Sequence, residues 1–137
     1  VNLTNSRLAG AKLRNTNLSG ANLSGANLSG ANLTNSRLGG VNLVNANLNN
    51  ASLNSAFLGG AELSGANLNN ANLNSAFLGG IELDGANLSG ANLNGARMWR
   101  AELSGAKLSG IRAINLRGCP QTLPNGWFCE NSSLIER

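Results

Sequence analysis

Large apolar residues occupy every fifth position of this 137-residue chain, from Leu3 to Leu108. All 22 of these positions hold leucine except Met98. A step of five residues is unsuited to an α-helix, where it advances the side chain by about 500° and scatters it around the axis. An odd step also alternates between the two faces of a straight strand. A chain that turns a corner after each pentad places all the leucines inside, and four pentads then close one square coil.

The other pentad positions support this geometry. The residue two before each leucine is small, most often alanine, and strand alternation points it inward with the leucine. The residue between them is polar or charged, apart from two phenylalanines, and is expected to point outward. The last residue is Gly in 13 pentads, Asn in six, Ser in two and Arg once, at Arg100. A positive φ, which the third residue of a type II turn requires, favours this composition.

A longer period, equal to four pentads, indicates how many pentads form one coil. Residues 51–70 are nearly repeated by residues 71–90. Self-similarity at a fixed period is typical of a solenoid, in which each repeat contacts only its neighbours. The sequence therefore predicts one solenoid domain over residues 1–110, followed by a different segment over residues 111–137.

The run Ala-Asn-Leu-Ser-Gly, at residues 21–25 and 86–90, resembles the signature of the pentapeptide repeat proteins, and the resemblance covers the whole predicted solenoid. It implies an all-β fold, a right-handed quadrilateral β-helix. With four pentads in each coil, the 22 pentads amount to about five and a half four-sided coils. One departure from the family is that Asn usually precedes the leucine here, where the family often has Asp.

The segment over residues 111–137 is expected to cap the open end of the solenoid, where unpaired backbone groups and leucines are otherwise exposed. Its apolar residues Leu123, Trp127, Phe128 and Leu134 are predicted to cover that end. The segment also contains the only two cysteines, Cys119 and Cys129. Their spacing across a turn suits a disulfide, and two reduced, buried thiols are the alternative. Without histidine, two thiols make a poor metal site, so none is predicted.

A disulfide implies an oxidising compartment. The tail from Cys119 to Cys129 also resembles the ends of exported pentapeptide repeat proteins from cyanobacteria and plant thylakoid lumens. This resemblance implies the thylakoid lumen or periplasm, with the cytoplasm as second choice. No apolar run is long enough for a membrane span. Val1 begins mid-pattern without an initiator Met, which we take to indicate a processed or trimmed chain.

The composition argues against an enzyme. The chain has no His, no Tyr and no Ser or Cys with a base beside it, so we predict no catalytic residue and no cofactor. Glu62, Glu82 and Glu102 recur at the coil period and form one column. A cation site is one interpretation, but hard cations need six or more converging oxygens. A solvated face with Arg97, Arg100 and Lys107 as nearby counter-charges is favoured.

The candidate interaction surface lies on the fourth side of the coils. The outward column there contains Arg37, Phe57, Phe77 and Arg97, and a neighbouring column of glycines ends at Trp99. Contiguous exposed aromatic side chains often mark contacts with a partner. The alternative is that Phe57 and Phe77 stabilise each other as a ladder pair between neighbouring coils.

These observations favour a non-catalytic structural or protein-interaction module whose partner is a protein. Some pentapeptide repeat proteins mimic duplex DNA and occupy DNA gyrase, but such mimicry requires a strongly negative surface and this chain has a net charge of +4. Direct nucleic-acid binding is not expected, because the basic residues are scattered. A homodimer through one end of the solenoid is compatible with the sequence. Binding to ice or a crystal face is a further alternative, based on the ladder Asn27, Asn47, Asn67 and Asn87.

Overall fold

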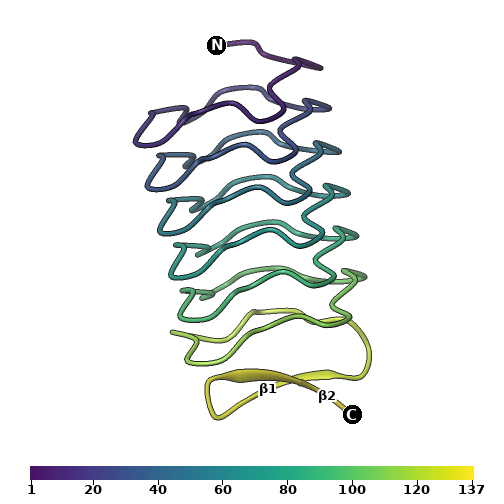
Figure 1. Ribbon diagram of the computed structural model, residues 1–137. Coiled ribbons are helices and arrows are strands. Elements are labelled where there is room, and N and C mark those ends of the chain that lie inside the picture. The colour runs from purple at the N-terminus through teal and green to yellow at the C-terminus, as the bar shows by residue number, and fades with distance from the viewer.

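The computed structural model describes all 137 residues and stacks them as four-sided coils closed at the C-terminal end by a hairpin (Figure 1). Parallel bridges join residues four pentads apart, beginning with Asn2 and Asn22 and ending with Glu102 and Thr122. One coil therefore takes four pentads, as the longer sequence period predicts. We number the faces along each coil by their bridging residues: 2, 22 and onward for the first face, 7 for the second, 12 for the third and 17 for the fourth.

A tight turn forms each corner of the coils. All 22 corner residues have positive φ, between 56° and 73°. The next residue closes the turn by donating its N–H to the leucine carbonyl, as Ala26 does to Leu23 over 3.0 Å. A positive φ at the third residue together with this closing bond defines the predicted type II turn.

The asparagine that precedes the central residue in half of the pentads stabilises this corner. In every one of the eleven pentads that have it, the Asn Oδ1 accepts a hydrogen bond of 3.0–3.1 Å from the backbone N–H two residues later. No backbone carbonyl accepts from these N–H groups. The asparagine thus satisfies the one donor that the coil-to-coil ladder leaves free.

The leucines and the small residues two positions before them make up most of one core of 38 buried residues. This confirms that both sets point inward. From Leu23 onward the central leucines and Met98 are buried. Leu3, Leu8, Leu13 and Leu18 are only partly buried, because a second coil covers the first on one side alone. The stack of leucine layers is the main source of hydrophobic stabilisation.

The coil-to-coil pairing does not stop at residue 110, where the sequence pattern decays. Arg112, Arg117 and Thr122 still bridge to the coil before them. In this last layer the sizes are exchanged: Ala113 lies at a leucine position, and Leu116 lies at an alanine position. Both are buried, so the core continues to the end of the stack.

The two named strands form an antiparallel hairpin beneath this layer, β1 over Trp127–Glu130 and β2 over Ser133–Glu136 (Figure 1). Leu134 of β2 is buried and donates its N–H to the carbonyl of Ala113 over 3.0 Å. Leu123 and Trp127 are partly buried and pack against the core. None of the chain's segments is a helix with the length and hydropathy of a membrane span.

Phe128 does not contribute to the cover, and the prediction that it does is wrong. Its side chain is 45% exposed, and the Arg137 guanidinium carbon lies 5.6 Å from the ring centroid. Successive side chains of a strand point to opposite faces. Because Trp127 and Cys129 face the solenoid, Phe128 between them faces solvent.

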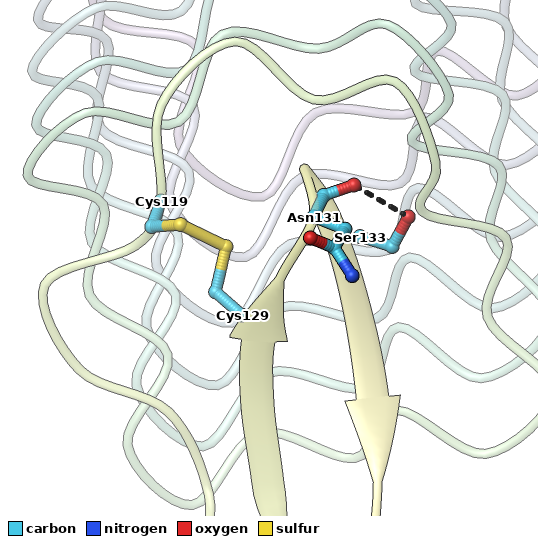
Figure 2. The surroundings of a disulfide bond; sticks show 4 residues. All are labelled: Cys119, Cys129, Asn131 and Ser133. Carbon is cyan, nitrogen blue, oxygen red and sulfur yellow. Dashed lines mark hydrogen bonds between the residues drawn. A yellow bond between two sulfur atoms is a disulfide. The ribbon is translucent and has the colours of Figure 1, made fainter.

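Cys119 and Cys129 form a disulfide that ties the loop after the last coil to β1 (Figure 2). The hairpin turn follows directly, with positive φ at both Asn131 and Ser132, as in a type I′ turn. Beyond β2, Arg137 makes a bidentate ion pair with Glu130. A covalent bond and an ion pair thus hold a segment that lacks the leucine repeat.

Replacing Ser36 by alanine is expected to stabilise the protein. Ser36 is the one buried polar residue of the core, and its hydroxyl has no hydrogen-bond partner. An unpaired buried hydroxyl costs on the order of 1 kcal/mol. Ser36→Ala should raise the free energy of unfolding by about that amount in urea titrations followed by circular dichroism. Ala56→Ser, one coil further in the same column, should lower it. Equal stability of both variants would contradict this assignment.

Loss of the disulfide is expected to loosen the cap and leave the coils folded. The bond closes a short loop, worth about 2.5–3 kcal/mol on the chain-entropy model. In Cys119→Ser/Cys129→Ser, native-state hydrogen exchange should therefore accelerate at β1 and β2 while the amides of residues 23–90 stay protected. Mass spectrometry of unreduced wild-type protein should show the linked peptide pair. Free alkylation of both thiols in protein from its native compartment would rule out this role.

Candidate functional site

The fourth face brings together the residues predicted for the interaction surface. Arg37, Phe57, Phe77 and Arg97 follow one another in successive coils through parallel bridges. The structure adds Arg117, which bridges to Arg97. Sequence reasoning missed Arg117 because it follows the decay of the pentad pattern, although its place one coil period after Arg97 could have indicated it. We call these five residues the arginine–phenylalanine column.

The two phenylalanine rings stack on each other in the middle of this column. Their centroids are 4.5 Å apart and their planes differ by 12°. The guanidinium carbon of Arg97 lies 4.3 Å from the Phe77 centroid, a cation–π contact that covers one end of the stack. Arg37 lies over no ring, and Phe57 is 45% exposed. The stack is therefore closed towards the cap and open towards Arg37.

Glycines leave the backbone bare beside the stack. Gly39, Gly59 and Gly79 form the adjacent column, which ends at Trp99, a side chain that is 56% exposed. A hollow of about 380 Å³ lies at the open end of the stack, between Phe57 and Arg37. A second hollow of about 400 Å³ lies at the cap end, where Phe77 and Arg97 contribute to its wall.

The indole of Trp99 packs over the loop of the cap. A Cβ placed on Gly118 would lie only 2.5 Å from the Trp99 Nε1. Gly118 also has a φ of +81°, in the left-handed region that favours glycine. The glycine therefore permits the close approach that fixes Trp99 beside the column.

The acidic and basic residues of the coils lie on different faces. All four acids of the coils lie on the first face, as Glu62, Glu82, Asp84 and Glu102, and the fourth face has none. The one salt bridge in the structure joins Arg137 to Glu130 in the cap. None of the bases expected as counter-charges, Arg97, Arg100 and Lys107, forms an ion pair with the first-face acids. The bases are scattered over the other three faces, as the sequence predicts, and Arg37, Arg97 and Arg117 share one column of the fourth.

The asparagine side chains that form the ladder of the second face stabilise the turns of the coils. Asn27, Asn47, Asn67 and Asn87 are bridge partners in successive coils, as the sequence predicts. Each side-chain carbonyl accepts the N–H of its own turn. The ladder thus has a function within the fold.

The chain thus has a repeating pentad, corners of positive φ and a ladder between residues one coil period apart. Residues 2–40, 42–80 and 81–119 match the family model described as pentapeptide repeats in eight copies. The chain belongs to the pentapeptide repeat family. Among curated proteins none is significantly similar to it in sequence.

Solved structures of pentapeptide repeat proteins resemble this one. HetL of the cyanobacterium Nostoc sp. strain PCC 7120, involved in the regulation of heterocyst differentiation, is 36% identical with a TM-score of 0.59, and the match covers 85% of this chain and 59% of HetL. Rfr23 of the cyanobacterium Cyanothece 51142 is 38% identical with a TM-score of 0.39, covering 76% and 64%. A protein of the Arabidopsis thaliana thylakoid lumen is 27% identical with a TM-score of 0.34, covering 77% and 66%. The chain thus spans less than two thirds of HetL and of Rfr23.

Gly118→Ala is expected to displace Trp99 from this pentapeptide repeat protein. The added methyl group would overlap the indole, and the positive φ would strain the backbone by roughly 1–3 kcal/mol. Gly105→Ala is the matched control, because its φ of +68° gives the same strain while its nearest neighbour is a backbone atom at 3.9 Å. Tryptophan fluorescence should change in Gly118→Ala and not in Gly105→Ala. An unchanged spectrum in both would contradict the packing of Trp99.

Proposed function

We propose that this pentapeptide repeat protein is a non-catalytic protein-interaction module that binds its partner through the fourth face. The contact residues are Arg37, Phe57, Phe77, Arg97 and Trp99. The observation that supports this is the stacked pair of the exposed Phe57 and the half-buried Phe77, at positions where the turns favour asparagine. Aromatic side chains flanked by arginines are the residue types that dominate binding energy in protein interfaces.

The fold gains little from having phenylalanine at these positions. A stacked aromatic pair at the surface is worth about 0.5–1 kcal/mol beyond its burial. Asparagine at either position would supply the turn hydrogen bond that all eleven pentads with Asn have, worth about 1 kcal/mol. With Phe57 and Phe77 in place, the N–H groups of Gly59 and Gly79 have no such acceptor. The stacking energy of the two rings and the energy of the missing turn hydrogen bonds are of similar size. Stability alone therefore gives no reason for phenylalanine at both positions, whereas contact with a partner does.

An exported compartment, the thylakoid lumen or periplasm, is proposed as the location. The disulfide between Cys119 and Cys129 supports this, because such bonds persist in oxidising environments. The loop of the cap lacks the leucine repeat that stabilises the coils. The disulfide therefore stabilises this segment in an oxidising compartment, where the bond persists.

A contact without catalysis is compatible with the regulatory involvement of HetL, which is 36% identical to this chain. Gyrase inhibition through DNA mimicry has less support. Duplex DNA carries one negative charge for about every 1.7 Å of its length, and a mimic needs a comparable surface. Here the four acids of the coils occupy a single face, and the chain has a net charge of +4.

Phe57→Asn/Phe77→Asn tests the interaction. The variant should fold with equal or higher thermal stability, because it restores two turn hydrogen bonds. In a pull-down from the native compartment, a protein that wild type retains and that mass spectrometry identifies should be lost, by at least tenfold in a direct binding assay. Glu62→Asn/Glu82→Asn is the matched control, since it makes the same substitution in two neighbouring coils on the first face. It should keep the binding.

Three results would overturn the proposal. Equal capture by both double variants would show that the fourth face is not the contact. A melting temperature many degrees lower in Phe57→Asn/Phe77→Asn would show that the stack is structural. Inhibition of gyrase supercoiling at low micromolar wild-type protein would favour DNA mimicry instead.

A further inference from the structure

The hollow at the cap end of the fourth face combines positive charge with hydroxyl and amide groups. It has a volume of about 400 Å³ and lies at the corner between the third and fourth faces. Its polar and aromatic lining consists of Ser55, Ser75, Phe77, Arg97, Asn115 and Arg117. Gly95 keeps it open, because it is the corner residue between Ser75 and Asn115 and has no side chain to fill the space.

The two arginines in the hollow are neighbours without a counter-charge. Arg97 and Arg117 are bridge partners, so their backbones lie one layer, about 4.8 Å, apart. The cation–π contact with Phe77 holds the guanidinium of Arg97 in place. Neither arginine pairs with a carboxylate, and no acid lies on this face. Like charges in adjacent layers are unfavourable, and an anion bound between them removes that cost.

The serines of the hollow occupy positions that the fold does not favour for serine. Ser55 and Ser75 are the only serines among the 22 corners, which otherwise hold Gly, Asn and one Arg. Both have positive φ, 56° and 58°, which glycine and asparagine adopt more readily. The hydroxyl of Ser75 donates to the Asn74 Oδ1 over 3.1 Å, a neutral hydrogen bond that is weaker than one to an ionised acceptor. Both serines line the same hollow as the two arginines.

We propose that this hollow binds a tetrahedral, doubly charged oxyanion, as inorganic phosphate or the phosphate group of a monoester. Two guanidinium groups match the two charges, and their planar donor sets suit oxyanions. The serine hydroxyls and the Asn115 amide add neutral donors, and the lining offers no carboxylate to repel the ligand. This site shares Phe77 and Arg97 with the proposed protein contact but does not rest on it, because it requires only the purified chain.

Titration of the ¹⁵N-labelled full chain with sodium phosphate at pH 7.5 and constant ionic strength tests the site. Saturable shifts are expected at the amides of residues 75–77, 95–97 and 115–117. Acetate should bind at least tenfold more weakly, because it has one charge. Phenyl phosphate distinguishes the two sources: tighter binding than phosphate identifies a monoester as the better ligand, and weaker binding identifies the free ion.

Charge-matched variants separate this site from general attraction to a basic protein. Arg117→Gln and Arg97→Gln should each weaken phosphate binding at least tenfold. Arg7→Gln removes the same charge from the second face and should change the affinity by less than twofold. Ser55→Ala/Ser75→Ala keeps the charge and should weaken binding several-fold. Circular dichroism checks folding, and Arg117→Lys replaces Arg117→Gln where the latter unfolds, with a several-fold loss expected from its missing donor fork.

Linear, unsaturated shifts spread over all four faces would overturn the site, as would equal losses in Arg7→Gln and Arg117→Gln. A phosphate affinity unaffected by both serine substitutions and by Arg97→Gln would also overturn it. None of these outcomes bears on partner capture by Phe57 and Phe77, which is measured without phosphate.

Discussion

The corner at every fifth residue is the constraint on which the rest of this structure depends. Each corner has a positive φ and a closing hydrogen bond to the leucine carbonyl, and in eleven pentads an asparagine accepts one further N–H group. When four such corners follow one another, the chain returns to its starting direction and lies directly over itself. The leucines then meet at the centre because the corners put them there. Burial of the leucines stabilises the closed coil, but it does not by itself select a spacing of five residues.

This register turns sequence intervals into columns on the surface. A residue four pentads away is the nearest neighbour in the next coil, so five outward side chains from Arg37 to Arg117 form one continuous column. Outward side chains contribute little to the core and can vary more freely than the inward ones. The first face can therefore collect all four acids of the coils while the fourth face carries Arg37, Arg97 and Arg117. The solenoid thus has acidic and basic residues on different faces while its leucine core stays the same.

Most of the fold could be predicted because the same physical requirement recurs in every pentad. The inward leucines, the small residues beside them, the corners and the stacking of Phe57 on Phe77 all follow from two periods. Prediction weakened where the pattern decays. The outward direction of Phe128 depends on the register of the hairpin, which no repeat specifies, and Arg117 lay beyond the expected end of the coils. The hollow beside Arg97 depends on side-chain volumes at several corners, so no single spacing indicates it. The reason for Asn before leucine also needed the structure, since only there is the unpaired N–H visible.

The near-repetition of residues 51–70 in residues 71–90 has a further structural consequence. Because its length equals one coil, each residue of one segment lies directly beside its counterpart in the other. A single phenylalanine on one coil would present an isolated apolar side chain, whereas two identical coils present a stacked pair of rings 4.5 Å apart. The same repetition pairs Ser55 with Ser75 and Gly59 with Gly79. The aromatic stack, the bare backbone beside it and the two corner hydroxyls therefore share one cause, a coil that occurs twice. When the repeated segment is as long as one coil, each outward side chain lies in contact with an identical one in the next layer. Repetition of one coil thus turns single surface groups into paired groups.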